Sequence, residues 1–181
     1  MNDVVLLIVG KSGSGKTTIT EYLKNTYKLK PLYSYTDRPQ RYEGEIGHTF
    51  VTRQEFDKIS KDNMVAYTEF DGYRYCATNE QINNSDLYII DKKGVDYLKE
   101  RYIGQKNIKT IYVQVSWYRR LYRMLKRGDS IYAAVKRLIH DFVAFKNIEV
   151  DCTILNEKVS LNSLCVSIMT YRNICIKRGL R

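Results

Sequence analysis

Short apolar runs recur along the chain, and most of them end at a glycine or a polar residue. Runs of this length with turn-forming borders are typical of strands that are buried on both faces of a parallel sheet. Four such runs lie at residues 4–9, 87–90, 108–115 and 152–155, and a shorter extended piece lies at 31–35.

Between these runs, apolar residues recur at spacings of three and four, which indicates amphipathic helices. Helices are predicted at 17–27, after Asp91 through Val95 and Leu98, over 118–145 with a break at Gly128-Asp129, and over 161–176. Strands that alternate with helices favour an α/β fold, in which a parallel central sheet is flanked by helices.

The segment 36–79 has a different pattern. Turn-forming residues and alternating polar and aromatic residues replace the long apolar runs. Alternation with a period of two is typical of half-buried antiparallel strands. We therefore predict a small antiparallel insert with one helix at 53–61. At 181 residues, the chain is expected to form a single domain that includes this insert.

The composition is that of a folded protein. Hydrophobic residues make up 44% of the chain, which argues against intrinsic disorder. Apolar runs fall well short of the ~20 residues of a membrane-spanning helix. The start carries Asp3 and lacks the positive region of a signal peptide. A cytoplasmic protein with four reduced cysteines is therefore expected.

Positive charge is in excess. Thirty Lys and Arg residues against twenty Asp and Glu give a net charge of +10, which suits nucleic acid, a membrane surface or a phosphorylated substrate. The positive residues are densest between Arg119 and Arg137, where Asp129 is the only acid. This imbalance favours a surface that faces phosphate over a helix with paired charges.

Residues 10–17, GKSGSGKT, match the phosphate-binding pattern GxxxxGK[ST] between a predicted strand and a predicted helix. Backbone N–H groups and the helix N-terminus at such a loop bind phosphate oxygens. Lys16 is expected to contact the β and γ phosphates of ATP, and the Thr17 hydroxyl to bind Mg²⁺. The expected ATP contacts are Gly10, Ser12, Gly13, Ser14, Gly15, Lys16, Thr17 and Thr18.

A second phosphate site is predicted at Arg38 and Arg41, since two guanidinium groups at this spacing can clamp a dianionic phosphate. A turn with two surface arginines fits the same pattern. Asp91 follows a predicted strand, at the sheet edge where open α/β folds bind ligands. Glu69 is either a carboxylate that accepts hydrogen bonds from a base or an exposed hairpin residue.

The chain resembles the guanylate kinase family along nearly the whole of its own length, and several further motifs carry this resemblance. The resemblance rests on Ser34, Thr36, Arg38, Pro39 and Arg41 (S-x-T-[TD]-R-P-x-R), on Phe50, Val51, Thr52 and Phe56 (F-V-[ST]-x-x-x-F), on Glu69, Phe70, Gly72 and Tyr75 (E-[FH]-x-G-x-x-Y), on Asp91, Gly94 and Val95 (D-x-x-G-V), on Asp151, Ile154 and Asn156 (D-x-x-[IL]-x-N), and on the lid arginines Arg123, Arg127 and Arg137.

The resemblance implies the P-loop nucleoside-monophosphate-kinase fold and a single domain. Its core is expected at 1–33, 82–117 and 141–181, its NMP-binding insert at 34–81 and its helical lid at 118–140. It also implies Mg²⁺-dependent transfer of the γ-phosphoryl group from ATP to GMP or dGMP. The implied partners are these nucleotides, without nucleic acid or membrane, for a monomer or homodimer.

Individual roles follow from the same resemblance. Lys16, Arg123, Arg127 and Arg137 are the implied catalytic residues, and Asn156 is implied to lie near the ATP adenine. The implied acceptor contacts are Ser34, Arg38, Arg41, His48, Glu69, Tyr75, Thr78 and Asp91.

The chain departs from the family pattern in ways that concern the acceptor. His48 stands where the family has a phosphate-binding tyrosine, and it is either a donor to phosphate or an exposed turn residue. Cys76-Ala77 removes a hydroxyl expected on the guanine, and the adjacent Thr78 is expected to compensate through a change of register. Ile89 replaces an aspartate, and the lid's acidic run is reduced to Gly128-Asp129-Ser130.

Three other functions stay open at this point. The departures are compatible with a nucleotide kinase of shifted acceptor base. A non-catalytic guanylate kinase-like interaction module fits the fold, although such modules typically lose the working phosphate loop that this chain keeps. A nucleic-acid-binding ATPase fits the charge, although a helicase or RNA-binding signature is missing.

Overall fold

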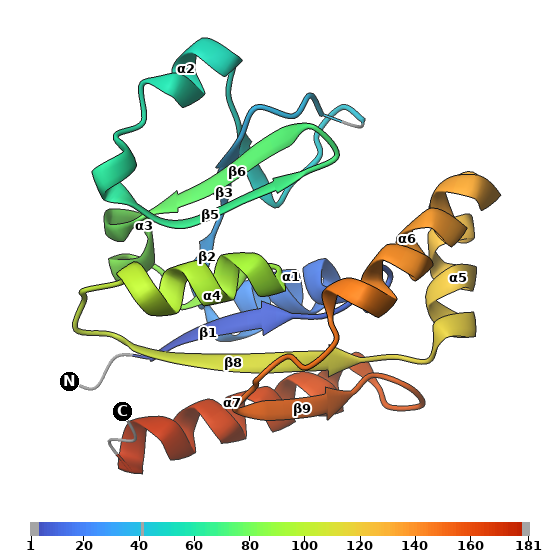
Figure 1. Ribbon diagram of the computed structural model, residues 1–181. Helices are drawn as coiled ribbons and strands as arrows, with labels where there is room; N and C mark the ends of the chain where they lie inside the picture. Colours follow the sequence, from blue (N-terminus) through green and yellow to red (C-terminus); the bar gives the residue numbers. More distant parts are fainter. Residues whose placement is uncertain (1–3, 41, 179–181) are drawn as a thin grey trace.

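Strand β1 (Val4–Val9) lies in the middle of a five-stranded parallel sheet (Figure 1). The computed structural model describes residues 4–40 and 42–178. In the order β2-β7-β1-β8-β9, the other strands are β2 (Pro31–Leu32), β7 (Leu87–Ile89), β8 (Asn107–Gln114) and β9 (Cys152–Leu155). The parallel sheet confirms the predicted α/β fold.

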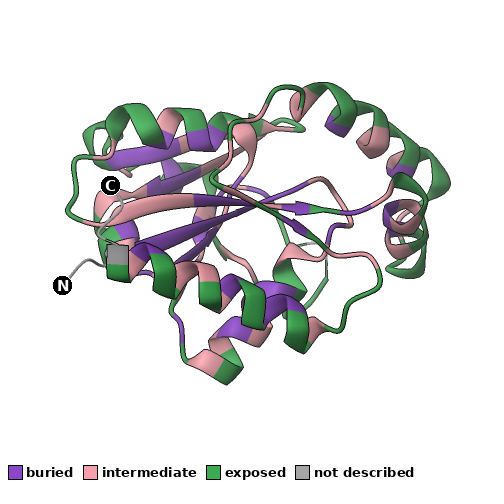
Figure 2. Ribbon diagram, turned by 90° about the horizontal axis from the view of Figure 1, so that it is seen from below, coloured by how far each residue is buried: buried purple, intermediate pink, exposed green. Residues whose placement is uncertain are grey.

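The two faces of β1 pack against different layers, because successive side chains of a strand point to opposite sides. Val4, Leu6 and Ile8 pack with helices α1 (Lys16–Tyr27) and α7 (Leu161–Arg178). Residues 5, 7 and 9 face helix α4 (Lys92–Arg101) and part of the insert. All six side chains are fully buried, and the buried strands form the interior in Figure 2. Burial on both faces explains the unbroken apolar run.

The insert forms a second sheet with the order β4-β3-β6-β5. Its elements are β3 (Ser34–Thr36), β4 (His48–Phe50), α2 (Arg53–Asp57), β5 (Met64–Phe70), β6 (Tyr73–Thr78) and α3 (Asn79–Asn83). β6 is antiparallel to both β3 and β5, as predicted, but β3 and β4 are parallel. The 31–35 run is divided between the two sheets, since Pro31–Leu32 pairs with β7 and Ser34–Thr36 with β6.

The insert's helices differ from the prediction. The helix expected at 53–61 ends at Asp57, and a single 3₁₀ turn follows at Lys61–Asn63. Phe56 is its one buried residue, and Ile59, which lies beyond the end of the helix, packs against the same small cluster without extending it. Helix α3 was not predicted. It begins with a capping box, in which Thr78 and Gln81 bond to each other's backbone N–H.

The predicted break in 118–145 is confirmed. Helix α5 (Trp117–Lys126) and helix α6 (Ile131–Ala144) form a hairpin beside the sheet (Figure 1). Gly128 has φ 98°, which favours glycine, and the Ser130 hydroxyl caps α6 by accepting from the Ala133 N–H. None of the helices in the described ranges is long and apolar enough to cross a membrane.

Candidate nucleotide site

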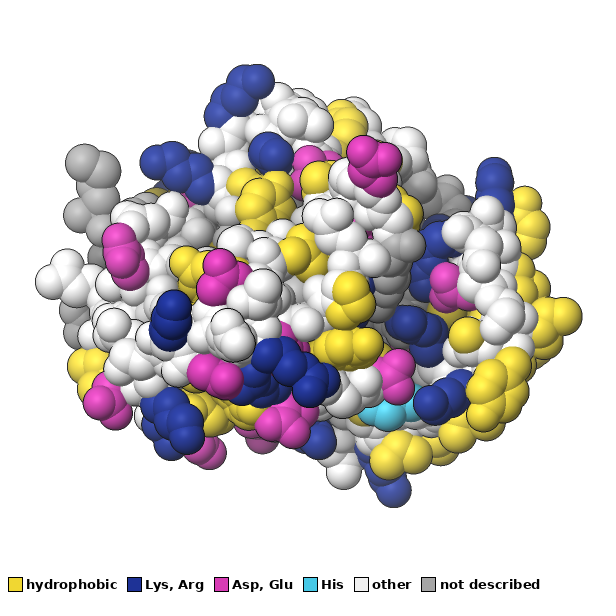
Figure 3. Space-filling model, turned by 90° about the horizontal axis from the view of Figure 1, so that it is seen from above, with side chains coloured by type: hydrophobic (Ala, Val, Ile, Leu, Met, Phe, Trp, Pro, Cys, Tyr) yellow, Lys and Arg dark blue, Asp and Glu magenta, His cyan; other side chains and the backbone are white. Residues whose placement is uncertain are grey.

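The candidate site lies at the carboxyl edge of the large sheet, where Gly10 follows β1 and Asp91 follows β7. A cavity of about 220 Å³ opens there. It is lined by Gly10, Ser12 and Lys16 of the phosphate loop, by Ser34, His48, Thr68, Phe70 and Tyr75 of the insert, by Tyr88, Ile89, Ile90 and Asp91, and by Arg137, His140, Asp141 and Phe145. From above, basic side chains lie along a hollow between the α5–α6 hairpin and the rest of the molecule (Figure 3).

The phosphate loop, residues 10–17, leads directly into α1. Gly13 and Gly15 have φ values of 75° and 92°, a conformation that side chains other than glycine rarely adopt. The Lys16 ammonium donates to the carbonyls of Gly10 (2.6 Å) and Lys11 (3.3 Å). Burial lowers the pKa of Lys16 to about 8, while the Asp141 carboxylate opposes this shift. Lys16 therefore lies across the loop, and the first-turn N–H groups of α1 point to the space where phosphate binds such loops.

Side chains from distant segments hold the loop. The Asn156 amide donates to the Ser14 carbonyl (2.8 Å), and the Arg123 guanidinium lies 3.4 Å from the carbonyls of Gly13 and Ser14. Asn156 thus supports the loop backbone, and its contact with adenine stays a prediction.

The three lid arginines are placed differently. Arg123 contacts the loop, and Arg137 lines the cavity. Arg127 is exposed and forms a bidentate ion pair with Asp129 in the turn between the helices. Two of the three predicted arginines are therefore beside the loop or the cavity, whereas Arg127 faces an acid of its own segment.

Arg38 is buried within the insert and is not among the residues that line the cavity. Its two terminal nitrogens donate to the Glu45 carboxylate at 3.1 and 2.8 Å, and its guanidinium lies over the Phe50 ring at 5.2 Å. Each partner's side chain in this ion pair is 7% exposed. Arg41, the other half of the predicted clamp, lies outside the described residues.

Ser34, His48 and Tyr75 converge on one wall of the cavity. The Ser34 hydroxyl and His48 Nδ1 are 2.9 Å apart, because Ser34 and His48 are directly paired in β3 and β4. The His48 and Tyr75 rings are 5.4 Å apart at their centroids. His48 is thus part of the cavity wall.

Asp91 is held from two sides. One carboxylate oxygen caps α4 by accepting from the Gly94 N–H (2.7 Å), and the other accepts from the Thr68 hydroxyl (2.9 Å). Tyr88 is buried behind it, and burial raises the pKa of this phenol. Asp91 is therefore a fixed acceptor on the cavity wall.

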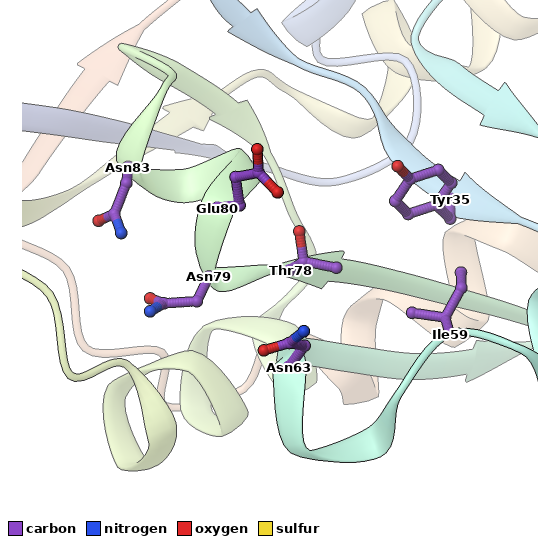
Figure 4. Close-up of a pocket in the computed structure, with 7 residues that line it drawn as sticks. All are labelled: Tyr35, Ile59, Asn63, Thr78, Asn79, Glu80 and Asn83. Atoms are coloured by element: carbon purple, nitrogen blue, oxygen red, sulfur yellow. The ribbon is translucent and has the colours of Figure 1, made fainter.

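Glu69 and Thr78, both predicted to contact the acceptor base, do not line this cavity. Thr68 and Phe70 line it, so the alternation of β5 turns the intervening Glu69 to the other face, where it is exposed and bonds the Tyr67 hydroxyl. The Thr78 hydroxyl accepts from the Gln81 N–H as the cap of α3. Thr78 lines a different cavity, of about 450 Å³, with Tyr35, Ile59, Asn63, Asn79, Glu80 and Asn83 (Figure 4).

Comparisons with known proteins agree with this architecture. A family model described as "AAA domain" matches residues 6–137. The guanylate kinases of Helicobacter pylori strains 26695 and J99 are each 30% identical over 171 residues, covering 86% of this chain and 81% of the relative. The chain belongs to the guanylate kinase family.

Solved structures support the fold alone. A guanylate kinase from Anaplasma phagocytophilum aligns with a TM-score of 0.62 at 22% identity, covering 99% of this chain and 89% of that one. An uncharacterized protein from Eubacterium ventriosum aligns with a TM-score of 0.50 at 14% identity, covering 93% and 98%. With its intact phosphate loop, this member of the guanylate kinase family is a P-loop nucleotide kinase.

Some residues at the candidate site were not predicted from the sequence. Thr68 and Tyr88 line the cavity, and Arg120 and Asp141 bond to the phosphate loop. The alternation in β5 is a signal for Thr68, because it puts Thr68 and Phe70 on one face. A contact between Arg120 and Asp141, twenty-one positions apart on two helices, leaves no comparable trace in the sequence.

Proposed function

We propose that the chain transfers the γ-phosphoryl group of ATP to GMP or dGMP, giving ADP and the corresponding diphosphate. The observation that carries this proposal is one shared cavity. Lys16 and Gly10 of the phosphate loop line the same space as Ser34, Tyr75 and Asp91. A donor phosphate on the loop and an acceptor against the insert would therefore meet directly, as in-line phosphoryl transfer requires.

Charge neutralisation would come from basic residues around the loop. Lys16, Arg123 and Arg137 lie at the loop or the cavity, and we propose that they stabilise the charge of the transferring group. Arg127 is assigned the same role after the hairpin closes and its ion pair with Asp129 opens. Closure would also keep water away from the γ-phosphate.

Mg²⁺ fits this arrangement. Thr17 is exposed in the first turn of α1, and hydroxyl and phosphate oxygens are the ligands that Mg²⁺ prefers. Thr17 would bind the ion together with the ATP phosphates, and the ion would reduce the phosphates' negative charge. Among the described residues, no group of three or more His, Cys, Asp or Glu side chains forms a metal cluster of its own.

The acceptor would be held by its phosphate and its base. Tyr75, Arg38 and Arg41 are assigned to the acceptor phosphate. Arg38 would then be shared between Glu45 and the phosphate. Ser34 and Asp91 are assigned to the base, because an ionised carboxylate only accepts hydrogen bonds and guanine offers adjacent N–H donors.

A kinase with a shifted or broadened acceptor base is the second candidate. Glu69 is on the far face of β5, and Ala77 is fully buried without a polar group. Asp91 is therefore the only carboxylate from the predicted acceptor set that lines the cavity in the described residues. Fewer polar groups on the base would weaken discrimination among nucleotides.

Acceptor specificity with purified protein separates these candidates. ADP formation is measured in a coupled assay with GMP, dGMP, AMP, CMP or UMP as acceptor, with K16M as the matched inactive variant. We expect the highest kcat/KM with GMP or dGMP. Comparable values for several bases would favour the second candidate. A flat response to every nucleotide would overturn the kinase proposal, and stimulation of ATP hydrolysis by RNA or DNA would favour a nucleic-acid-dependent ATPase.

A further inference from the structure

A buried ion pair connects the two helices of the hairpin directly to the phosphate loop. Arg120 of α5 and Asp141 of α6 are each 4% exposed, and Arg120 Nη2 lies 2.6 Å from Asp141 Oδ2. Both residues join the hairpin to Ser12 of the loop, whereas Arg127 of the lid is exposed.

The pair binds both backbone groups of a single loop residue. The Ser12 N–H donates to Asp141 Oδ2 (2.7 Å), and the Ser12 carbonyl accepts from Arg120 Nε (2.8 Å). Ser12, Arg120 and Asp141 thus form a closed ring of charge-assisted hydrogen bonds, which are stronger than neutral ones.

The next residue shows how closely the helix approaches the loop. A Cβ atom on Gly13 would lie 2.8 Å from the Arg120 carbonyl oxygen and 3.2 Å from its Cα. A side chain at position 13 would therefore push α5 away from the loop. Two independent features, the ion pair and the glycine, fix the same junction.

Two of the lid arginines are on the same helical faces as this junction. Arg123 lies three residues after Arg120 on α5, and Arg137 lies four residues before Asp141 on α6. Residues at these spacings are neighbours on one face of a helix. Anchoring Arg120 and Asp141 to Ser12 therefore also sets where Arg123 and Arg137 stand relative to the loop.

We propose that Arg120 and Asp141 are positioning residues, which fix the backbone of the phosphate loop at Ser12 and align the hairpin's arginines with bound ATP. With the Ser12 N–H taken by Asp141, the first-turn N–H groups of Lys16, Thr17 and Thr18 are left to hold phosphate. This inference rests on the proposed binding of ATP at the loop, and it does not depend on which base the acceptor carries.

A double-variant comparison separates positioning from stability. Removing one partner of a buried pair leaves an uncompensated charge, whereas replacing both by apolar residues of similar size is often neutral. We expect R120M and D141L to have lowered melting temperatures and R120M/D141L to regain most of the loss. The double variant still lacks both bonds to Ser12, so its Kd for Mg-ATP should stay at least about tenfold above wild type.

Mg-ATP binding is measured by titration calorimetry without an acceptor, below the melting temperature of each variant. R120K is the second test. The lysine ammonium keeps the positive charge that pairs with Asp141, but it cannot reproduce the planar guanidinium, which donates to Asp141 and to the Ser12 carbonyl at the same time. It should melt near wild type and bind Mg-ATP more weakly. R172M is the matched control. Arg172 forms a partly buried ion pair with Asp86 (3.0 Å), and neither residue lines the cavity. It should change the melting temperature and leave the Kd unchanged.

The outcomes are distinct. If R120M/D141L regains both stability and wild-type affinity for Mg-ATP, the pair is merely structural and the inference is wrong. Wild-type affinity in R120K would contradict it equally. If the wild-type protein itself does not bind Mg-ATP, the proposed function fails, and the inference that rests on it fails with it.

Discussion

The Thr68 hydroxyl donates a hydrogen bond to the Asp91 carboxylate across 2.9 Å, joining the insert to the start of α4 in the core. Asp91 also caps α4 through the Gly94 N–H. A single carboxylate therefore bonds to the insert, caps a helix of the core and lines the cavity. This contact is the structural basis for assigning Asp91, with Thr68 behind it, to the acceptor base.

Replacing Thr68 by valine tests this assignment. T68V keeps the shape of the side chain and removes the donor to Asp91, so the carboxylate loses one of its two bonds. A hydrogen bond to a charged group is worth about 1.5 kcal/mol, which corresponds to a factor of about ten. We expect the KM for GMP to rise about tenfold with a smaller change in the KM for ATP. T49V, which removes an exposed hydroxyl from the same insert, is the control. Equal KM values for GMP in T68V and wild type would exclude Thr68 from the acceptor site.

Glu69 should be dispensable for base preference. Its carboxylate is exposed on the opposite face of β5 from the cavity and bonds to Tyr67. We expect E69Q to keep the ratio of kcat/KM for GMP to that for AMP within about twofold of wild type, whereas D91N should lower it. A loss of guanine preference in E69Q would show that the insert rearranges to bring Glu69 into the site.

The sequence was sufficient wherever one local pattern determined the outcome. The apolar run at Val4–Val9 predicted a strand buried on both faces, and the GKSGSGKT pattern predicted a loop that leads from this strand into a helix. Gly128-Asp129 predicted the break between the helices, because glycine permits the left-handed conformation found there. Each of these depends on chemistry within a few residues.

The structure also places some of the proposed residues differently, and it adds contacts between distant segments. Glu69 matched a motif, but the alternation of β5 sends its neighbour Thr68 into the cavity instead. Thr78 carries the expected hydroxyl, yet capping α3 uses it. The Arg120–Asp141 pair is formed only when two helices and the loop meet. Neither residue type nor spacing along the chain encodes such a meeting.

Lys16 is expected to matter for turnover more than for folding. Its ammonium donates to the carbonyls of Gly10 and Lys11, and a rotation of the side chain would bring it to a bound phosphate. K16M removes one charged donor from the transferring group, and the loss of one such donor typically costs about 10²–10³ in kcat. K11M is the matched control, because Lys11 is the neighbouring loop lysine and lies over the Phe142 ring at 5.9 Å. Similar kcat values for K16M and K11M would contradict the assignment.

Arg74 stabilises the insert through Asp37, and the effect should depend on pH. Asp37 has a side chain only 3% exposed, and it accepts from the Arg74 N–H (2.8 Å) and Nε (2.7 Å). Burial alone would raise the pKa of Asp37, but the hydrogen bonds from Arg74 outweigh it and the pKa lies below its usual 3.8. The pair therefore stabilises the fold above about pH 4, and this contribution is lost as the pH falls through the lowered pKa.

R74M should lower the free energy of unfolding at neutral pH by about 3 kcal/mol, because it leaves a buried carboxylate without its partner. In the variant, burial without the partner then raises the pKa of Asp37. Protonation of Asp37 at low pH therefore stabilises the fold of the variant, whereas it destabilises the fold of the wild-type protein. The difference in free energy of unfolding should consequently shrink between pH 6 and pH 3, as measured by urea denaturation at each pH. K136M, which removes an exposed pair with Asp71, should show little difference at any pH. A difference between R74M and wild type that stays constant over this range would mean that Asp37 is not the residue through which Arg74 acts.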